Sequence, residues 1–563
     1  MSSSSKKKLR KEQAAADLTG KQTAQQKEDR KVRRMTVAFI VVIALAICSA
    51  AATLGIRAYR NSGVHERSIT ALTVGSHKLN STELNYFYVD AINNFYQSLH
   101  SSYGSSASSA AQMMYGLDFT KPLDEQAYSN SSETDADIKT WGDYFVQLAE
   151  NTAKATYAVY DDAVTNNFTL SDDAKATVTT QMNTLTSTAK SSGFSSLKKY
   201  LKAMYGNGAT TDSYESYLTA SVLASSYAAD HSANLDITDA DLRAYEADKY
   251  DEYSSYSYAT YYVAKSNYIT GGTTDDDGNT TYTDEEQQAA IDAAKADADK
   301  LVAAATSLDE FNKAIAALDV NKEKDSAKAT EYTDQAYSNV NTTAKEWITD
   351  SSRKAGDVTC IENTTESTDD DGNTKTSVNG YYVVLFQNCN ENKFPLANVR
   401  HILVKFEGGT TDSKGNTTYS NEEKAAAKEK AESLLQQWKD GAATEESFAA
   451  LAKETSEDSG SVANGGLYED VYPGQMVTNF NDWCFAEGRK AGDTGIVESD
   501  YGYHVMYYVG DSDITYRDYR ITADVRSKWM QEWQDGLTSS VSFEIGDISG
   551  LNTSLVLSRA STT

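Results

Sequence analysis

The sequence predicts a multidomain protein of α+β class with a single transmembrane helix near its amino terminus. Length is the first observation, because 563 residues exceed the usual size of one domain several times over. An uncharged apolar run lies early in the chain, and one series of motifs occurs twice in the second half. Helical spacing of apolar residues and strand-like alternation both occur, so helices and strands are expected together.

The amino-terminal part predicts a membrane anchor. Residues 1–34 are polar and rich in Ser, Lys and Gln, which is typical of a disordered tail. Met35–Ile56 is an uncharged run of 22 residues, long enough to cross the roughly 30 Å apolar core of a bilayer. The tail holds eleven Lys and Arg against four acids, and such basic flanks stay in the cytoplasm. We therefore expect a single-pass protein of the cell membrane, with everything after Arg57 outside.

A cleaved signal peptide is the alternative interpretation of this segment. The letters LAIC around Cys48 are similar to a lipoprotein cleavage site. Ile47 stands where such a site needs a small residue, and the basic region is long for a signal peptide. Both observations favour an uncleaved signal-anchor.

Charge and cysteine content limit the possible ligands. The whole chain carries −29 and the tail +7, which leaves −36 for the rest. Nucleic acid is not expected as a partner, because binding its phosphates needs clustered positive charge. Four cysteines without a CxxC pair or a Cys/His cluster argue against a metal site, and no cofactor is expected. Cys360 and Cys389 flank a predicted hairpin, where a disulfide and two free thiols both stay open.

Residues 57–255 predict a helical region. Leu84 and Tyr88 lie at helical spacing in a segment that begins at Ser81, a good capping residue. The glycines of YGNGATTD separate two further helices, and another helix is expected from Thr238.

Two later segments, 256–390 and 396–511, contain the same motifs in the same order. The first has GGTTDDDGNTTY, WITDSSRKAGD and NGYYVVLF, and the second has GGTTDSKGNTTY, WCFAEGRKAGD and YGYHVMYY. The glycine-rich loops share ten of twelve residues at an offset of 137, and the RKAGD motifs keep an offset of 136. Agreement of order and spacing over this length predicts a duplicated domain.

The second copy has one histidine on its first predicted strand and one on its last. NVRHILVKF alternates like a strand and carries His401, and GYHVMYYV is a closing strand that carries His504. Helices are expected over Glu422–Trp438 and Ser447–Ala452. With SEDSGSVANGG and PGQMVTNFNDWCF between them, these motifs resemble the parvulin-type (PpiC/rotamase) peptidyl-prolyl cis-trans isomerases. The resemblance implies a βα3βαβ2 fold for 396–511.

The resemblance also implies the site residues. His401, Asp458 and His504 correspond to the polar catalytic group, and Met476 and Phe480 to the pocket for the proline ring. The other substrate-binding residues implied are Tyr468, Gln475 and Ser499. Rotation about an X-Pro bond meets a barrier of about 18–20 kcal/mol, and no covalent bond breaks. Binding the twisted amide is therefore sufficient for catalysis, and neither a nucleophile nor a cofactor is required.

The first copy is predicted to be inactive. Tyr261 and Tyr382 stand in place of the two histidines, and after the GGTTDDDGNTTY loop neither a second glycine pair nor a Gly-Gln-Met motif lies between them. The second copy departs from the family at Tyr468, where an apolar Leu is usual. Lys405 is followed by a neutral to acidic loop, whereas relatives that bind phosphorylated substrates carry a basic cluster there. Unphosphorylated substrates are therefore expected.

The order of the whole chain resembles that of SurA- and PrsA-like foldases, with a helical chaperone lobe before the isomerase domains. Residues 512–563 add an amphipathic helix with Trp529, Trp533 and Leu537 on one face, and the resemblance implies that this segment packs on the chaperone lobe. We expect an extracytoplasmic bacterial isomerase and chaperone whose partners are unfolded or newly exported proteins with X-Pro bonds. A non-catalytic holdase that only captures such peptides is the alternative, and the oligomeric state stays open.

Overall fold

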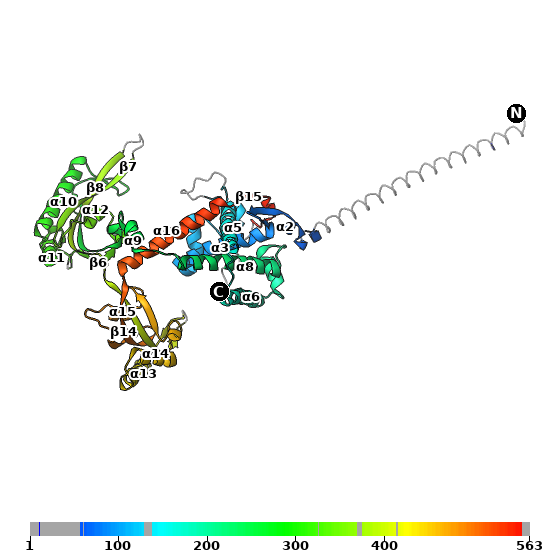
Figure 1. The fold of residues 1–563 in the computed structure, drawn as a ribbon. Coiled ribbons are helices and arrows are strands. Elements are labelled where there is room, and N and C mark those ends of the chain that lie inside the picture. Colours follow the sequence, from blue (N-terminus) through cyan, green and yellow to red (C-terminus); the bar gives the residue numbers. More distant parts are fainter. Residues whose placement is uncertain are drawn as a thin grey trace, which may run out of the picture. The chain divides into compact units, whose positions relative to one another are not determined.

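The computed structural model describes residues 57–59, 61–128, 138–324, 326–368, 374–412 and 415–553, together with Lys11. The chain divides into two compact units, whose elements are labelled in Figure 1. Unit 1 consists of Met1–Leu235 and Trp529–Thr563, and unit 2 of Asp236–Lys528. The chain thus leaves unit 1, forms all of unit 2 and returns. The finer domain boundaries expected from the sequence remain a proposal.

Unit 1 is mainly helical. Its helices are α2 (Val64–Ser68), α3 (Ser81–Tyr103), α4 (Ala107–Tyr115), α5 (Trp141–Thr165), α6 (Asp172–Ser191), α7 (Leu197–Tyr205) and α8 (Thr211–Ala233). The core gathers apolar side chains of α3 and α5, among them the buried rings of Phe87, Trp141 and Phe145. Burying such large rings is the main favourable contribution to packing these long helices.

A small sheet joins segments from near both ends of the described chain. Its order is β15-β1-β2, formed by β1 (Thr70–Val74), β2 (His77–Asn80) and β15 (Phe543–Ile545). β15 runs antiparallel to β1, with Leu72 opposite Ile545, and is drawn in red beside the blue strands in Figure 1. Unit 1 is therefore completed only by the carboxy-terminal segment.

Helix starts in this unit follow the capping rules, with one shift from the sequence prediction. The side chain of Asn80 accepts hydrogen bonds from two backbone N–H groups in the first turn of α3. Asn80 is therefore the N-cap, and the predicted Ser81 is the first helical residue. α9 (Asp239–Glu246), which belongs to unit 2, is capped by Thr238 as predicted.

The apolar face predicted for the carboxy-terminal helix lies on the helical lobe. α16 (Tyr516–Ser540) begins in unit 2 and ends in unit 1. Within unit 1, its Trp533 and Leu537 pack with Val159 of α5 and Tyr227 of α8. Trp533 also stacks on His231 of α8, with ring centroids 4.2 Å apart.

The membrane anchor predicted for Met35–Ile56 is corrected. No helix in the described ranges is both long enough and apolar enough to cross a bilayer. The predicted span itself lies outside the described residues. The fold class is therefore mixed α and β over several domains. The described residues therefore do not support the predicted transmembrane helix or the predicted single-pass membrane location.

Unit 2 contains two four-stranded antiparallel sheets, with orders β6-β3-β8-β7 and β12-β9-β14-β13. The first sheet consists of β3 (Ser255–Ala264), β6 (Thr330–Ala336), β7 (Val358–Thr368) and β8 (Thr374–Asn390). The second consists of β9 (Pro395–Lys405), β12 (Leu467–Val471), β13 (Thr494–Ser499) and β14 (Gly502–Thr515). In each sheet the four strands, counted along the chain, lie side by side in the order second, first, fourth, third. We call the two halves of unit 2 that contain these sheets the first and second repeat.

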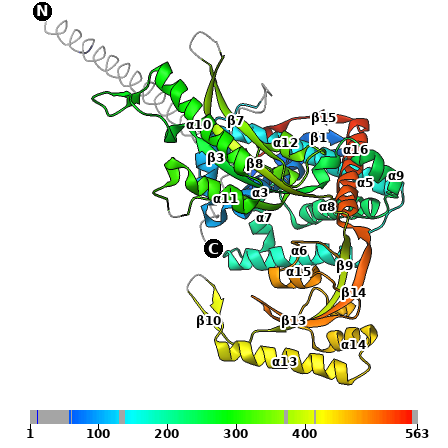
Figure 2. The same cartoon turned by 90° about the vertical axis from the view of Figure 1, so that its left-hand side faces the viewer.

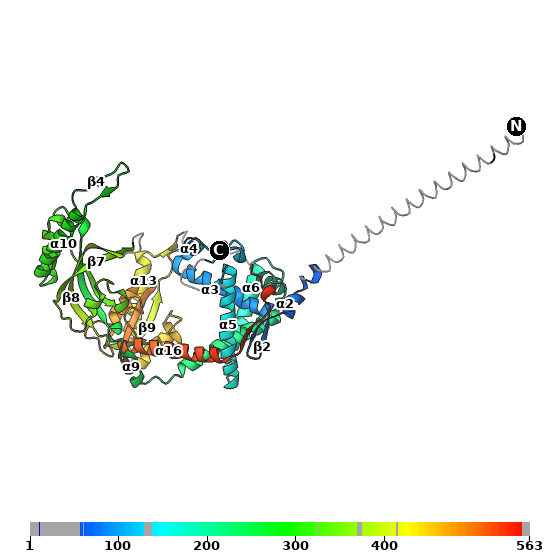
Figure 3. The same cartoon turned by 90° about the horizontal axis from the view of Figure 1, so that it is seen from above.

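The helices of the two repeats also follow one order. The first repeat has the hairpin β4 (Thr273–Thr274) and β5 (Thr280–Thr281), then α10 (Asp284–Ala304), α11 (Leu308–Ala317) and α12 (Lys345–Thr349). The second has β10 (Thr410–Thr411), β11 (Thr417–Thr418), α13 (Asn421–Asp440), α14 (Glu445–Thr455) and α15 (Thr478–Cys484). Figure 3 shows the β4 hairpin projecting beyond α10. In the second repeat, α13 and α14 lie on one side of the sheet and α15 on the other (Figure 2).

The strand register corrects one correspondence between the repeats. His504 pairs with the residue two places after His401. At the matching point of the first sheet, Tyr382 pairs with the residue two places after Thr260. Thr260 therefore lies at the place of His401, and the predicted Tyr261 does not.

Tyr261 instead faces the helices of the first repeat. It packs against the α10–α11 core, and its hydroxyl lies 3.1 Å from Oδ1 of Asn321. A shift of one residue along a strand moves a side chain to the opposite face of the sheet. The two cysteines left open by the sequence, Cys360 on β7 and Cys389 on β8, are free thiols.

Candidate active site

Two buried histidines lie side by side on the central strands of the second repeat. His401 is on β9 and His504 on β14, and they are diagonal neighbours in the antiparallel pair. Side chains alternate along β9, so Ile402 and Val404 pack under α13 and α14. His401 consequently points to the α15 side, as does His504. Their Nδ1 atoms are 3.0 Å apart.

The loop after α14 delivers a carboxylate to this pair. Two hydrogen bonds to the backbone of Leu403 attach the loop to β9. Leu403 N–H donates to Ser456 Oγ, and Glu457 N–H donates to the carbonyl of Leu403. Asp458 follows directly, with its Oδ2 2.9 Å from Nε2 of His401. The sequence Ser-Glu-Asp thus places the carboxylate by fixing the two residues before it.

Asp458 accepts two further hydrogen bonds at the same oxygen. Ser461 Oγ donates to Oδ2 over 2.5 Å, and the Tyr468 hydroxyl donates over 3.0 Å. These bonds hold the pKa of Asp458 well below its usual range, and the bond from His401 has the largest effect. Asp458 is therefore ionised at neutral pH. Burial and the bond to Asp458 raise the pKa of Tyr468, so its hydroxyl keeps its proton.

An ionised Asp458 determines the direction of every bond in the chain. A carboxylate only accepts, so Nε2 of His401 carries the proton, and Nδ1 of a neutral His401 accepts one from His504. Nε2 of His504 then accepts from Ser499 Oγ, which lies 2.7 Å away. Burial, followed by the nearby His401, lowers the pKa of His504 to about 4. The inferred chain therefore holds one neutral tautomer of His504 at pH 7.

The glycine pair before β12 is required by the geometry of this site. Gly465 and Gly466 both have positive φ, at 69° and 73°. The carbonyl of Gly466 accepts a bond from the N–H of His401, and a Cβ on Gly466 would lie 2.1 Å from the carbonyl oxygen of His401. Only glycine fits this approach. The close contact brings β12, and with it Tyr468, against the histidine.

Apolar groups close the α15 side of the site. The ring of Phe480 is edge-on to both histidines, with centroids 5.3 Å from His401 and 5.5 Å from His504. Met476 is half-buried and packs in the same cluster. Gln475 differs from the expectation, because its exposed side chain accepts the backbone N–H of Tyr472 in its own loop.

The structure therefore brings together seven of the eight residues expected from the sequence. They are His401, Asp458, Tyr468, Met476, Phe480, Ser499 and His504. Ser461 was missed, although it bonds both Asp458 and His401. Its position three residues after Asp458 in a turn-rich segment was the available signal, because such spacing lets a hydroxyl reach back to the carboxylate.

Comparison with known proteins identifies the class of domain. Residues 383–510 match the family model described as "PPIC-type PPIASE domain". This match covers well under half of the chain and includes both histidine strands. It supports peptidyl-prolyl cis-trans isomerase activity of the parvulin type.

Individual relatives agree with that class. The chain is 36% identical over 115 residues to the foldase protein PrsA 1 of Listeria innocua, which covers 20% of this chain and 31% of the relative. It is 38% identical over 112 residues to the chaperone SurA of Chromohalobacter salexigens, covering 19% and 21%. A solved structure of the peptidylprolyl isomerase PrsA from Bacillus cereus matches 26% of this chain and 49% of its own, at 25% identity and a TM-score of 0.17.

The predicted resemblance to SurA- and PrsA-like foldases is confirmed by these relatives, which are named for foldase and chaperone roles. The chain spans about a third or less of the length of each of these two curated relatives.

Proposed function

We propose that the second repeat isomerises X-Pro bonds in unfolded, unphosphorylated clients, and that the whole chain acts as a chaperone for exported proteins. One observation carries the catalytic part: an oriented chain from Ser499 through both histidines to Asp458 lies against the rings and thioether of an apolar wall. The relatives' names support the binding of unfolded proteins.

The chemistry follows from what rotation does to the amide. The planar bond is stabilised by resonance, which places partial negative charge on the carbonyl oxygen and a double bond between carbon and nitrogen. Twisting removes this charge separation. A site that takes the amide out of water and holds it against Phe480 and Met476 lowers the advantage of the planar forms.

The hydrogen-bonded chain supplies fixed dipoles around that wall. Since His504 is neutral and is hydrogen-bonded at both ring nitrogens, the groups under the pocket do not need to reorient when the carbonyl turns. Tyr468 is half-buried, as are Asp458 and Ser499, so part of its side chain is open to solvent. We propose that it contacts the client close to the X-Pro bond.

The test is catalysed exchange in the full chain. Cis/trans exchange in an unphosphorylated Ala-Pro peptide should be accelerated by the wild type and slowed by His401→Ala at least tenfold. Exchange spectroscopy measures the rate without a coupled protease. A folded full chain that binds the peptide yet leaves the rate at its uncatalysed value would establish the non-catalytic holdase instead.

A further inference from the structure

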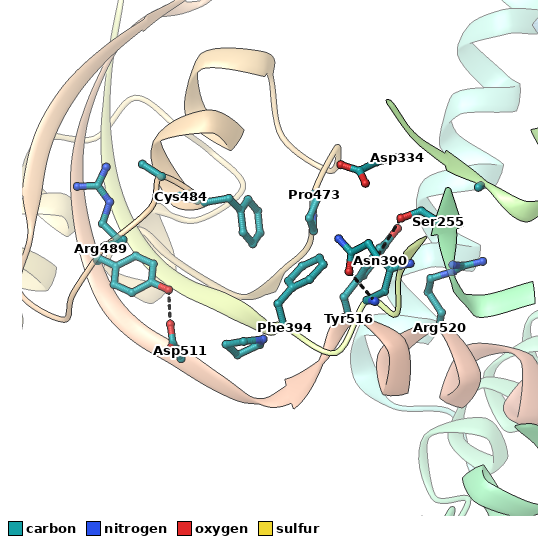
Figure 4. Close-up of a pocket in the computed structure, with 17 residues that line it drawn as sticks. Ser255, Asp334, Asn390, Phe394, Pro473, Cys484, Arg489, Asp511, Tyr516 and Arg520 are labelled. Atoms are coloured by element: carbon teal, nitrogen blue, oxygen red, sulfur yellow. Dashed lines mark hydrogen bonds between the residues drawn. The ribbon is translucent and has the colours of Figure 1, made fainter. Parts of the chain in front are cut away.

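The part of the chain that the structure describes encloses a larger and a smaller cavity, which differ in how their polar groups are used. The larger, of about 760 Å³, lies in unit 2 and is shown in Figure 4. Its Asp511 accepts the hydroxyl of Tyr508. Its Arg520 donates to two backbone carbonyls. The smaller cavity, of about 360 Å³, lies in unit 1 and is lined by polar atoms that have no such partner.

Four segments that are far apart in the sequence form the smaller cavity. They are α2, the first turns of α3, the end of α7 with the loop after it, and the stretch Gly550–Asn552 after β15. Asn85 of α3 joins two walls, because its amide donates to the carbonyl of Tyr205 and its Oδ1 accepts the N–H of Asn552. Arg67 attaches α2 to the loop after α7 by donating to a backbone carbonyl there. A site formed before binding loses less entropy when it is occupied.

Three oxygen atoms on these walls are buried without a hydrogen-bond partner. They are Oε2 of Glu66, Oγ of Ser81 and Oγ1 of Thr82. Ser81 is 0% exposed and Thr82 is 2% exposed. Neither hydroxyl is needed to cap α3, because Asn80 and Glu83 form its capping box. Buried polar groups in folded proteins are almost always paired, so these three oxygens need a partner from outside the chain.

Glycines let two backbone segments approach the two hydroxyls closely. A Cβ at Gly208 would lie 1.9 Å from Oγ1 of Thr82, and a Cβ at Gly550 would lie 2.5 Å from Oγ of Ser81. A side chain at either position would therefore collide with a hydroxyl. The loop after α7 and the carboxy-terminal stretch thus close around the hydroxyls, yet neither hydroxyl is hydrogen-bonded.

The three oxygens match a primary ammonium group. A carboxylate oxygen accepts hydrogen bonds, and a hydroxyl can also accept, so together they offer three acceptors to three N–H donors. The charge on Glu66 strengthens these bonds. A metal ion matches less well, because Ca²⁺ takes about 6–8 oxygen ligands. The described ranges also contain no group of three or more His, Cys, Asp or Glu residues that could hold a metal.

A positive side chain lines the same cavity. Lys202 of α7 makes one long hydrogen bond, of 3.4 Å, to the carbonyl of Asn61. Its ammonium group has three donors, so it can bind a carboxylate while keeping that contact. The cavity thus offers one negative and one positive side chain within about 360 Å³, a volume at the small end of ligand sites.

We propose that this cavity binds a small zwitterion of the α-amino-acid class, with its ammonium on Glu66, Ser81 and Thr82 and its carboxylate toward Lys202. Occupation links α2 and α3 to the walls formed by α7 and Gly550–Asn552, and so stabilises the closure of unit 1 by its carboxy-terminal segment. The inference is independent of the isomerase proposal, because none of these residues belongs to the second repeat.

The experiment titrates the full chain with glycine, L-alanine and L-glutamine in turn, by isothermal titration calorimetry. At least one should bind, and more tightly than glycinamide, acetate or calcium chloride. Thr82→Val and Glu66→Gln should each weaken that binding at least about tenfold, and Lys202→Met severalfold. Thr177→Val, at an exposed position on α6, is the matched control and should leave binding unchanged.

Hydrogen exchange gives a second measurement. The bound amino acid should slow exchange in residues 541–553 of the wild type and not in Thr82→Val. Circular dichroism identifies a variant that fails to fold, and Ser81→Ala then replaces it.

Two results would overturn the inference. If none of the three amino acids binds, or if binding survives both Thr82→Val and Glu66→Gln, the cavity holds only water. If glycinamide binds as tightly as the amino acids and Lys202→Met has no effect, the site takes an ammonium group alone, as a peptide amino terminus would supply, and the zwitterion is wrong.

Discussion

The two repeats of unit 2 share one sheet order but differ on a single face. In both, the face under the long helices is a continuous apolar core, with Val263, Val383 and Leu385 in the first repeat and Val404 and Val505 in the second. The opposite face holds the histidine network in one and a tyrosine-rich core in the other. The sheet face that packs against the long helices is therefore apolar in both repeats, whereas the residues on the opposite face differ between them.

The polar face of the first repeat has been filled rather than emptied. The ring of Tyr382 lies tilted against that of Tyr262 with centroids 4.7 Å apart, and Tyr258 stacks on Tyr332 at the same distance. These rings occupy the region that corresponds to the histidines and the proline wall. Rings thus take the place of the polar network on this face of the first repeat, where Tyr382 packs partly buried against an apolar core.

The largest effect is expected from removing one buried Phe ring in each repeat, which separates loss of stability from loss of activity. Phe480→Ala in the second repeat and Phe311→Ala in the first remove rings that are almost fully buried, so each should lower the free energy of unfolding by about 3–5 kcal/mol. Only Phe480→Ala should reduce kcat/KM beyond that, because Phe480 faces the histidines. Chemical denaturation and exchange rates under conditions where both variants are folded make the comparison. Equal loss of activity in both would remove Phe480 from the site.

Acid should destabilise the second repeat selectively. The pKa of His504 is lowered to about 4 from an ordinary value of about 6.5, so folding favours its neutral form. That stability is fully present above about pH 6.5 and is lost as the pH falls toward 4, by at most about 3 kcal/mol. The lowered pKa of Asp458 acts in the same direction below about pH 4.

The first repeat contains no histidine and serves as the internal control. Hydrogen exchange resolved by peptide, compared at pH 7 and pH 4.5 after correction for the intrinsic rate, should show lost protection in β9 and β14 and not in β3 and β8. Equal loss in both sheets would contradict the assigned role of His504.

Tyr468→Phe should have a smaller effect. It removes one of four donors to Asp458 and leaves those from His401, Ser461 and the backbone N–H of Gly460, so stability should fall by about 1–2 kcal/mol. The pKa of Asp458 should rise, and kcat/KM should fall severalfold. Carboxyl titration by NMR distinguishes this from simple loss of packing, since Tyr468→Leu should raise the same pKa while also losing ring contacts. An unchanged Asp458 pKa in both variants would show that the hydroxyl does not act on it.

The smallest expected effect is none at all. Thr260→His with Tyr382→His places two imidazoles at the positions that the strand register assigns, in a chain whose second repeat is inactivated by His401→Ala. Exchange in the Ala-Pro peptide should stay at the rate of that inactivated chain, because the first repeat lacks counterparts of Met476 and Phe480 to hold the proline ring. A rate above that background would show that paired histidines alone are sufficient.

Much of the second repeat could be predicted because its motifs are local. His401 and His504 lie on alternating strands whose period fixes the face they share, and the Gly465–Gly466 pair reports a backbone approach that only glycine allows. Ser461 could not be predicted in the same way. Its spacing from Asp458 was a local signal for that bond, but its bond to His401 depends on how the loop folds back onto β9.

Errors in the sequence prediction have similar physical causes. Tyr261 was matched to His401 because the two strands were aligned without their partners, and a shift of one residue exchanges the faces. Gln475 was carried over from a motif; its side chain accepts a hydrogen bond within its own loop, and its role in substrate binding stays a prediction. The expected membrane helix rested on composition alone, and the described helices include none that could span a bilayer.

The pairing of β15 with β1 has a consequence for synthesis of the chain. Leu72 cannot meet Ile545 until nearly the whole polypeptide has been made, and closing so long a loop is slow while the intervening chain is unfolded. If unit 2 folds first, it brings the two ends of its own segment together and shortens that search. In that case a ribosome-bound chain holds a folded second repeat before its helical lobe is complete, so isomerase activity should emerge before the lobe has formed.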